Sequence, residues 1–144
     1  MLVAILLIII NIYIFINTKE PHNFKLVKER YRILREHIEK NGPEEFKVLE
    51  NEIPLVAHNK IFNKTLGYNT NKGYEIGLCI DGEPNEIMHV LIHELAHSTV
   101  DEYSHSSNFW EQTKKLKNIC NELGIYQPIN SKTRFCSSYI QDGE

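Results

Sequence analysis

The chain has 144 residues, of which 42% are hydrophobic and 24% are charged, and it contains 7 glycines and 5 prolines. This length and balance fit one compact domain with a short appendage, and they exclude multidomain, disordered and collagen-like proteins. The 19 Asp and Glu outnumber the 16 Lys and Arg, which gives a net charge of -3. No overall positive field attracts nucleic acid, so nucleic acid is not an expected partner.

The first segment is the most apolar part of the chain. Residues 2–16 read LVAILLIIINIYIFI, and no Lys or Arg occurs before Lys19. A helix of this length covers about 23 Å, somewhat less than the roughly 30 Å hydrocarbon core of a bilayer. The alternatives are a cleaved signal peptide and an element of the core, but a signal peptide needs a basic start and a small-x-small cleavage site. We predict a transmembrane helix over residues 1–18, followed by one domain over residues 19–144.

The charges beside this segment predict its orientation. Basic residues mark the cytoplasmic side of a membrane segment, and they follow it closely as Lys19, Lys25, Lys28, Arg30, Arg32 and Arg35. We therefore expect a single-pass membrane protein whose domain faces the cytoplasm.

Two elements are predicted in the first half of the domain. Residues 21–41 carry apolar side chains at a spacing of three and four, which predicts an amphipathic helix that ends at Gly42-Pro43. An irregular stretch runs through Pro54. Residues 65–70 and 74–80 then resemble two strands around a glycine-containing turn, which predicts a hairpin.

Two more helices are predicted in the second half. The first spans about residues 85–99, with Pro84 suited to its first turn, and the second spans about residues 107–123, with a serine cap before it and Gly124 after it. We expect the second helix to bury Phe109, Trp110, Thr113, Leu116, Cys120 and Leu123. Residues 125–144 show no clear period.

Cys79, Cys120 and Cys136 are an odd number of cysteines with no close spacing. This pattern argues against a disulfide framework, so we expect three free thiols in a reducing compartment.

The first of these two helices carries the sequence His93-Glu94-Leu95-Ala96-His97. Positions four apart differ by only about 40° around a helix, so both imidazoles project from one face and can bind one metal ion. Zinc suits imidazole nitrogens, and a catalytic zinc site needs three protein ligands and one open position. Glu94 lies beside the two histidines, where it can act as general base without being a ligand.

His105 is the predicted third ligand, because the eight-residue spacing from His97 lets the chain end the helix and fold back under the metal. Asp101 and Glu102 are the alternatives. His89 shares the face of His93 but lies too far along the axis to join one tetrahedral ion, so we expect it behind the ligands or exposed to solvent. A structural zinc site is disfavoured because such sites are rich in thiolates and no C-x-x-C spacing occurs.

These motifs resemble a known group of enzymes. HELAH, His105, Asn108-Phe109-Trp110 and Gly124-Ile125-Tyr126 together are similar to the WLM and SprT-like small zinc metallopeptidases, most closely to the WLM-like members encoded by large nucleocytoplasmic DNA viruses. Ser137-Ser138 departs from the Gly-Met of that group. The resemblance implies an α+β, minimal zincin-like domain: a small sheet, an active-site helix and flanking helices. It also implies an edge strand that pairs with the substrate, for which residues 74–80 are the candidate.

The expected function is hydrolysis of peptide bonds in a protein or peptide substrate by a membrane-anchored enzyme with one catalytic Zn²⁺. The expected site is Glu94 as general base with His93, His97 and His105 as ligands, and Tyr103 or Tyr139 is a candidate for a second oxyanion donor. If the protein is viral, its membrane is that of the host cell or the virion. The rival functions are a catalytically idle zinc-binding module at a membrane and a protease of DNA-protein crosslinks. The sequence does not indicate the oligomeric state.

Overall fold

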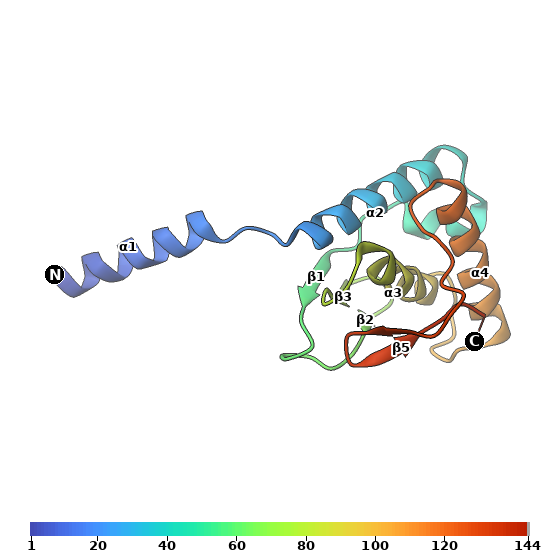
Figure 1. Cartoon of the computed structure of the whole chain (residues 1–144). Helices are drawn as coiled ribbons and strands as arrows, with labels where there is room; N and C mark the ends of the chain where they lie inside the picture. The colour runs from blue at the N-terminus through green and yellow to red at the C-terminus, as the bar shows by residue number, and fades with distance from the viewer. Residues whose placement is uncertain (144) are drawn as a thin grey trace.

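The chain begins with a helix that stands apart from the domain. The computed structural model describes residues 1–143, and in Figure 1 α1 (Leu2–Asn17) extends away from the remaining elements. None of its residues is buried in the structure. The helical prediction for this segment is therefore confirmed.

The prediction that α1 alone spans a membrane is not supported. Among the described residues, no single helix is both long enough and apolar enough to cross one. Helices α1 and α2 reach the length and apolar composition of a membrane span only when they are taken together, and a bend of 57° separates them.

Helix α2 (His22–Asn41) packs its apolar face on the domain. The residues at the predicted spacing of three and four are all buried, namely Phe24, Val27, Tyr31, Leu34 and Ile38. The Tyr31 hydroxyl accepts a hydrogen bond of 3.1 Å from the backbone N–H of Ile53, which satisfies the polar end of a buried aromatic side chain. Helix α2 is therefore part of the core, and moving it into a membrane would expose that core.

A three-stranded sheet follows the short 3-10 helix η1 (Glu44–Leu49). Its strands are β1 (Leu55–His58), β2 (Gly67–Thr70) and β3 (Glu75–Cys79), in the order β1-β3-β2. β2 and β3 form the predicted antiparallel hairpin, whereas β1 pairs with β3 in parallel and was not predicted. Residues 74–80 were predicted to form an edge strand, which is wrong, because β3 is paired on both sides. The free edges belong to β1 and β2.

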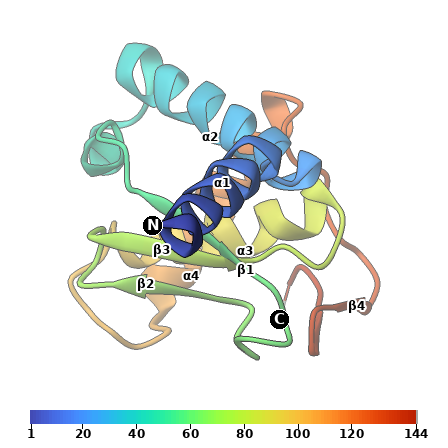
Figure 2. The ribbon, with the colours of Figure 1, turned by 90° about the vertical axis from the view of Figure 1, so that its left-hand side faces the viewer.

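Helix α3 (Pro84–His97) lies between the sheet on one side and α2 and α4 on the other, as Figures 1 and 2 show. A capping box begins it, because the Glu86 carboxylate accepts a hydrogen bond from the Glu83 N–H while the Glu83 side chain caps the backbone of Glu86. α4 (Ser107–Glu122) begins with the Ser106 hydroxyl accepting from the Phe109 N–H at 3.2 Å. Both predicted helices are confirmed, although Trp110 is 41% exposed rather than inward.

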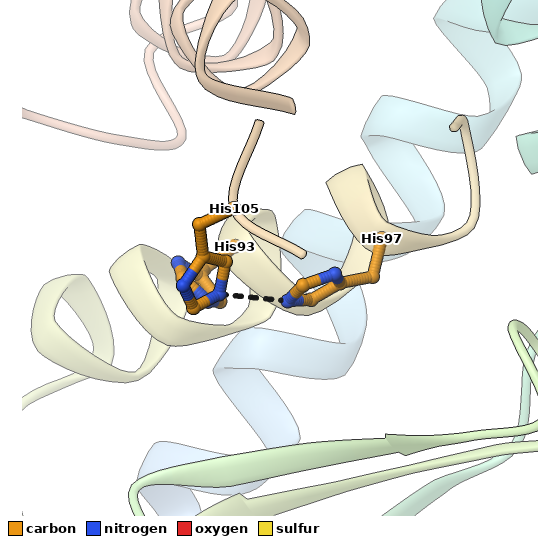
Figure 3. A group of neighbouring side chains, drawn as sticks. All are labelled: His93, His97 and His105. Carbon is orange, nitrogen blue, oxygen red and sulfur yellow. Dashed lines mark hydrogen bonds between the residues drawn. The ribbon is translucent and has the colours of Figure 1, made fainter. Parts of the chain in front are cut away.

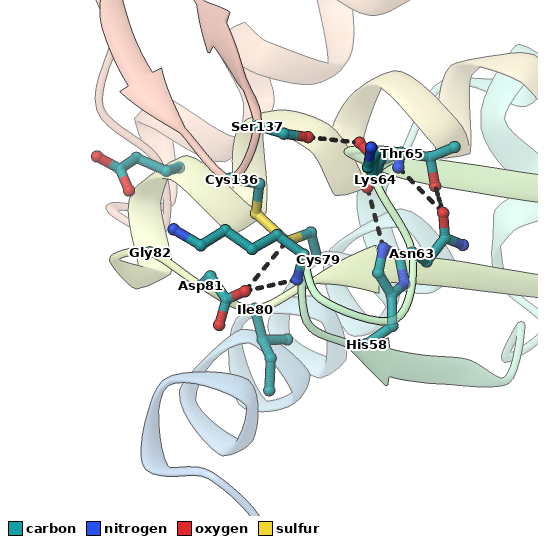
Figure 4. The surroundings of a disulfide bond; sticks show 12 residues. His58, Asn63, Lys64, Thr65, Cys79, Ile80, Asp81, Gly82, Cys136 and Ser137 are labelled. Carbon is teal, nitrogen blue, oxygen red and sulfur yellow. Dashed lines mark hydrogen bonds between the residues drawn. A yellow bond between two sulfur atoms is a disulfide. The ribbon is translucent and has the colours of Figure 1, made fainter.

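The C-terminal segment forms a second hairpin, which the sequence did not predict. Strands β4 (Thr133–Phe135) and β5 (Ser138–Ile140) pair antiparallel around a two-residue turn. Cys136 in that turn forms a disulfide with Cys79 at the end of β3, as Figure 4 shows. The expectation of three free thiols is therefore wrong for these two cysteines, because the fold brings together residues 57 positions apart. Cys120 is a buried free thiol, as expected.

Three free thiols in a reducing compartment would agree with a domain in the cytoplasm. With the disulfide present, that orientation rests on the basic residues after α1 alone. The coarse fold class is confirmed, since the domain is a mixed α+β structure with small sheets and flanking helices.

Candidate metal and catalytic centre

Three histidines converge on one point of the domain. His93 and His97 come from successive turns of α3, and His105 comes from the loop before α4. One ring nitrogen of each lies within 4.8 Å of the others, and the Nε2 atoms of His97 and His105 are 3.2 Å apart. Figure 3 shows the three rings facing one another. This donor set fits a single zinc ion with a fourth position left for a water or substrate.

The loop that returns His105 to α3 is held by a lysine. Asn71 and Lys72, at the turn between β2 and β3, both have positive φ angles, and the Lys72 ammonium donates to the carbonyls of Val100 and Glu102. Val100 is also buried. The loop is therefore fixed at its middle before it reaches His105, although nothing in the sequence around His105 indicates this contact.

One aromatic ring supports the three imidazoles. The Phe109 ring lies 4.9, 4.4 and 4.8 Å from those of His93, His97 and His105. Burial, together with the neighbouring histidines, lowers the pKa of His93 to about 3, and burial also lowers the pKa of His97. Both rings are therefore neutral at physiological pH, and the neutral ring is the form that binds a metal.

Glu94 is a buried carboxylate beside this cluster, with 8% of its surface exposed. Burial raises its pKa to about 7, because the charged form loses hydration inside the domain. Its side chain is not one of the three converging ligands. A carboxyl group with a pKa near neutrality can both take up and release a proton at physiological pH, which general base catalysis requires.

Strand β2 lies directly against the turn of α3 that carries Glu94. The Asn69 side-chain amide donates to the Glu94 carbonyl at 2.7 Å and to the Ser98 hydroxyl at 2.8 Å. This satisfies a carbonyl in the last turn of the helix. A Cβ atom on Gly67 would lie 2.6 Å from Cγ1 of Val90 and 3.3 Å from Cγ of Glu94. Glycine at position 67 therefore allows the free edge of β2 to approach the site.

Two cavities meet at Glu94. The first, which we call the α3 cavity, has a volume of about 320 Å³ and is lined by Leu66, Gly67, His89, Val90, His93, Glu94, Tyr139, Ile140 and Gln141. The second, of about 220 Å³, is lined by Asn69, Lys72, Glu94, His97 and Tyr103. Tyr139 and Tyr103, the two candidate oxyanion donors, thus border different cavities.

The predicted site residues are all brought together, and the alternatives are not. Neither Asp101 nor Glu102 belongs to the converging group among the described residues. His89 is not exposed to solvent, since its side chain is 12% exposed, and its Nδ1 lies 3.0 Å from the Tyr126 hydroxyl rather than against a predicted ligand. Sequence reasoning missed Asn69, Lys72 and the partners of His89, because single polar residues in a short strand, a turn or the tail carry no period.

The sequence profile of the WLM domain matches residues 44–138, which is well over half of the chain. The chain belongs to the WLM family. Neither a curated protein nor a solved structure matches the sequence. The matched WLM region contains the sheet, α3, the three histidines and α4, whereas α1 and α2 precede it.

Proposed function

We propose that this WLM protein is a zinc-dependent peptidase whose metal ligands are His93, His97 and His105 and whose general base is Glu94. One observation carries the proposal: three imidazoles converge beside a buried carboxyl group that faces two cavities. WLM membership supports it, because that family is associated with zinc-dependent peptidases.

The roles of the chain's own residues follow from this geometry. A zinc ion, when bound, supplies a Lewis acid that polarises a carbonyl and lowers the pKa of a water molecule. The Glu94 carboxylate takes a proton from the attacking water and later gives it to the nitrogen of the departing amine. The buried Phe109 ring covers one side of the three imidazoles, whereas His105 is open to solvent.

The free edge of β2 is the proposed binding surface for an extended peptide. The Cys79 N–H bonds to the Leu66 carbonyl. Since alternate residues of an antiparallel pair face the partner, the polar backbone groups of Gly67 and Asn69 point away from β3. A substrate strand can add to these groups by β-augmentation. This edge replaces the one expected from the sequence and passes directly over Glu94.

The ligand assignment is tested by the metal content of the full chain. We expect one zinc per wild-type chain and proteolysis of an unfolded protein such as denatured casein. In His105→Ala, we expect zinc affinity to fall at least about 100-fold, because removing even a residue that supports a ligand costs 10- to 100-fold. Inductively coupled plasma mass spectrometry and competition with a chelating dye measure these quantities.

His22→Ala is the matched control, because His22 is an exposed histidine outside the site. It should leave both zinc content and proteolysis unchanged. A wild-type chain without zinc contradicts the proposed site. A chain that binds one zinc but cleaves no unfolded protein or peptide would instead be the catalytically idle module.

We further propose that α1 anchors the domain to a lipid bilayer, with the domain on the cytoplasmic side. Its large apolar side chains are exposed around the helix, including Leu2 at 85% and Phe15 at 85%. Apolar surface on all sides of one helix requires a cover. A helix of 16 residues is about 24 Å long, shorter than the roughly 30 Å hydrocarbon core, so the proposal is attachment to the bilayer and not a full span.

Flotation with lipid vesicles tests this anchor. We expect the full chain to float with vesicles of neutral phosphatidylcholine and a variant lacking residues 2–17 to stay in the dense fraction. The variant should retain zinc, because α1 buries no residue against the domain. If both proteins stay in the dense fraction, α1 is not a membrane anchor.

A further inference from the structure

A polar network that the proposed mechanism does not use lies behind the α3 cavity. His89 on α3 is joined to Tyr126 and to Asp142, which follows β5. Asp142 also accepts hydrogen bonds from the Tyr126 hydroxyl at 2.6 Å, from the Ile129 N–H at 2.7 Å and from the Lys117 ammonium. The elements that supply these groups are far apart in the sequence, so the fold holds the network in place.

The hydrogen bonds determine which nitrogen of His89 carries its proton. Burial alone would raise the pKa of Asp142, but the hydrogen bonds from His89, Lys117, Tyr126 and Ile129 outweigh burial and hold it below its usual range. The ionised carboxylate accepts the hydrogen bond of the Tyr126 hydroxyl, so the hydroxyl oxygen is left as an acceptor for Nδ1–H of His89. When the imidazole is neutral, its lone pair therefore lies at Nε2.

The second ring nitrogen of His89, Nε2, is available to bind a ligand. In residues 1–143, Nε2 of His89 has no hydrogen-bond partner. The atom is also not fully buried. The ring lines the α3 cavity together with aliphatic side chains from Leu66, Val90 and Ile140. The cavity thus combines these apolar walls with polar groups, among which the hydrogen bonds to Tyr126 and Asp142 orient the His89 ring.

The direction of an added strand decides which substrate residue enters this cavity. Antiparallel pairing is the more stable form, so the substrate runs opposite to β2. Glu94 borders both cavities, with Gly67 in the α3 cavity and Asn69 in the other. Residues after the cleaved bond then lie on the Gly67 side. The first of them, P1′, has the α3 cavity beneath it.

We infer that the α3 cavity is the S1′ subsite, which receives the P1′ side chain. His89 there selects an uncharged side chain, such as that of glutamine, that donates a hydrogen bond to its Nε2. This inference rests on the proposed function and names its substrate class. Sites built to hydrogen-bond a substrate group reject analogues without it strongly, because the buried partner is left unpaired. Tyr126 and Asp142 act as positioning residues that fix the imidazole.

A set of four peptides that differ only at P1′ tests the inference. The full zinc-loaded chain is assayed with Gln, Leu, Glu and Lys at that position. We expect kcat/KM to be at least about tenfold higher for Gln than for the other three. In His89→Leu, the ratio of Gln to Leu should fall about tenfold or more, whereas His89→Gln should keep part of the preference. His22→Leu is the control and should leave the ratio unchanged.

The outcomes separate this inference from the proposed function. Cleavage of all four peptides at similar rates, or a preference for Leu, Glu or Lys in the wild type, overturns the subsite and leaves the peptidase standing. Absence of any cleavage, of these peptides or of unfolded protein, overturns the peptidase itself. The wild-type preference decides the matter even if the His89 variants fail to fold.

The tautomer gives a readout that does not depend on activity. Nitrogen-15 NMR of the zinc-free full chain, assigned by comparison with His89→Gln, should show His89 protonated at Nδ1 and unprotonated at Nε2. The opposite tautomer would remove the acceptor and overturn the inference.

Discussion

Replacing Glu94 by glutamine is expected to lower the rate of proteolysis about 10²- to 10⁴-fold, which is the usual contribution of a general base. Glutamine has nearly the shape of glutamate but cannot accept the proton of the attacking water. Because Glu94 is not one of the converging ligands, zinc should still bind with about one ion per chain. Initial rates on denatured casein or a fluorogenic peptide, together with zinc content, measure both effects.

The stability of Glu94→Gln distinguishes lost chemistry from lost structure. The carboxyl group is buried, and its raised pKa shows that ionisation costs free energy in the fold. A neutral amide removes this cost, so the thermal midpoint should not fall. Glu122→Gln, on the exposed end of α4, is the matched control and should keep full activity. More than a tenth of the wild-type rate in Glu94→Gln would show that another group is the base.

The helices of the domain could be predicted because each carries a local signal. The buried stripe of α2 repeats every three or four residues, α3 begins at a proline and α4 begins at a serine cap. The pair His93 and His97 follows from helical geometry alone. For His105, the spacing from His97 shows only that the loop is long enough to fold back to the metal, not that it does so. The loop that brings it back depends on Lys72, which is 33 positions away in the sequence.

The strand order could not be predicted from the same kind of signal. Residues 74–80 are apolar on both faces, which is typical of a strand covered on both sides, but the partner β1 has only four residues and no alternation of burial. Recognising β3 as a central strand requires the parallel pairing with β1, which is a long-range contact. The sequence alone therefore suggested β3 as the edge strand for the substrate, whereas the strand order of the sheet leaves β2 with the free edge.

The tail was the least predictable part. Strands of three residues are too short to show a period, so neither the β4–β5 hairpin nor the contribution of Asp142 to the network around His89 could be read from the sequence. The disulfide could not be predicted for a similar reason. An odd number of cysteines argued for free thiols, but pairing depends on which residues the fold makes neighbours, and Cys120 is the one left buried and unpaired.

Removing the disulfide is expected to destabilise the domain by about 4 kcal/mol. A crosslink over 57 residues restricts the unfolded chain by about this amount in the loop-entropy treatment, within the 2–5 kcal/mol usual for native disulfides. Urea denaturation of Cys136→Ser, compared with the wild type before and after reduction, measures the change. Cys120→Ser is the control for loss of a thiol alone. Equal stability of Cys136→Ser and the oxidised wild type would contradict a formed disulfide.

The same substitution should also affect the proposed substrate site. The hairpin tied by Cys136 supplies Tyr139, Ile140 and Gln141 to the α3 cavity. Without the disulfide, the Ser137 hydroxyl bond to the Lys64 carbonyl, at 2.7 Å, is the main polar tie left between this turn and the loop beside β2. We therefore expect Cys136→Ser to raise KM for peptides while zinc content stays at one. Loss of zinc would instead mean that the disulfide supports the histidines themselves, which lie on α3 and the loop before α4.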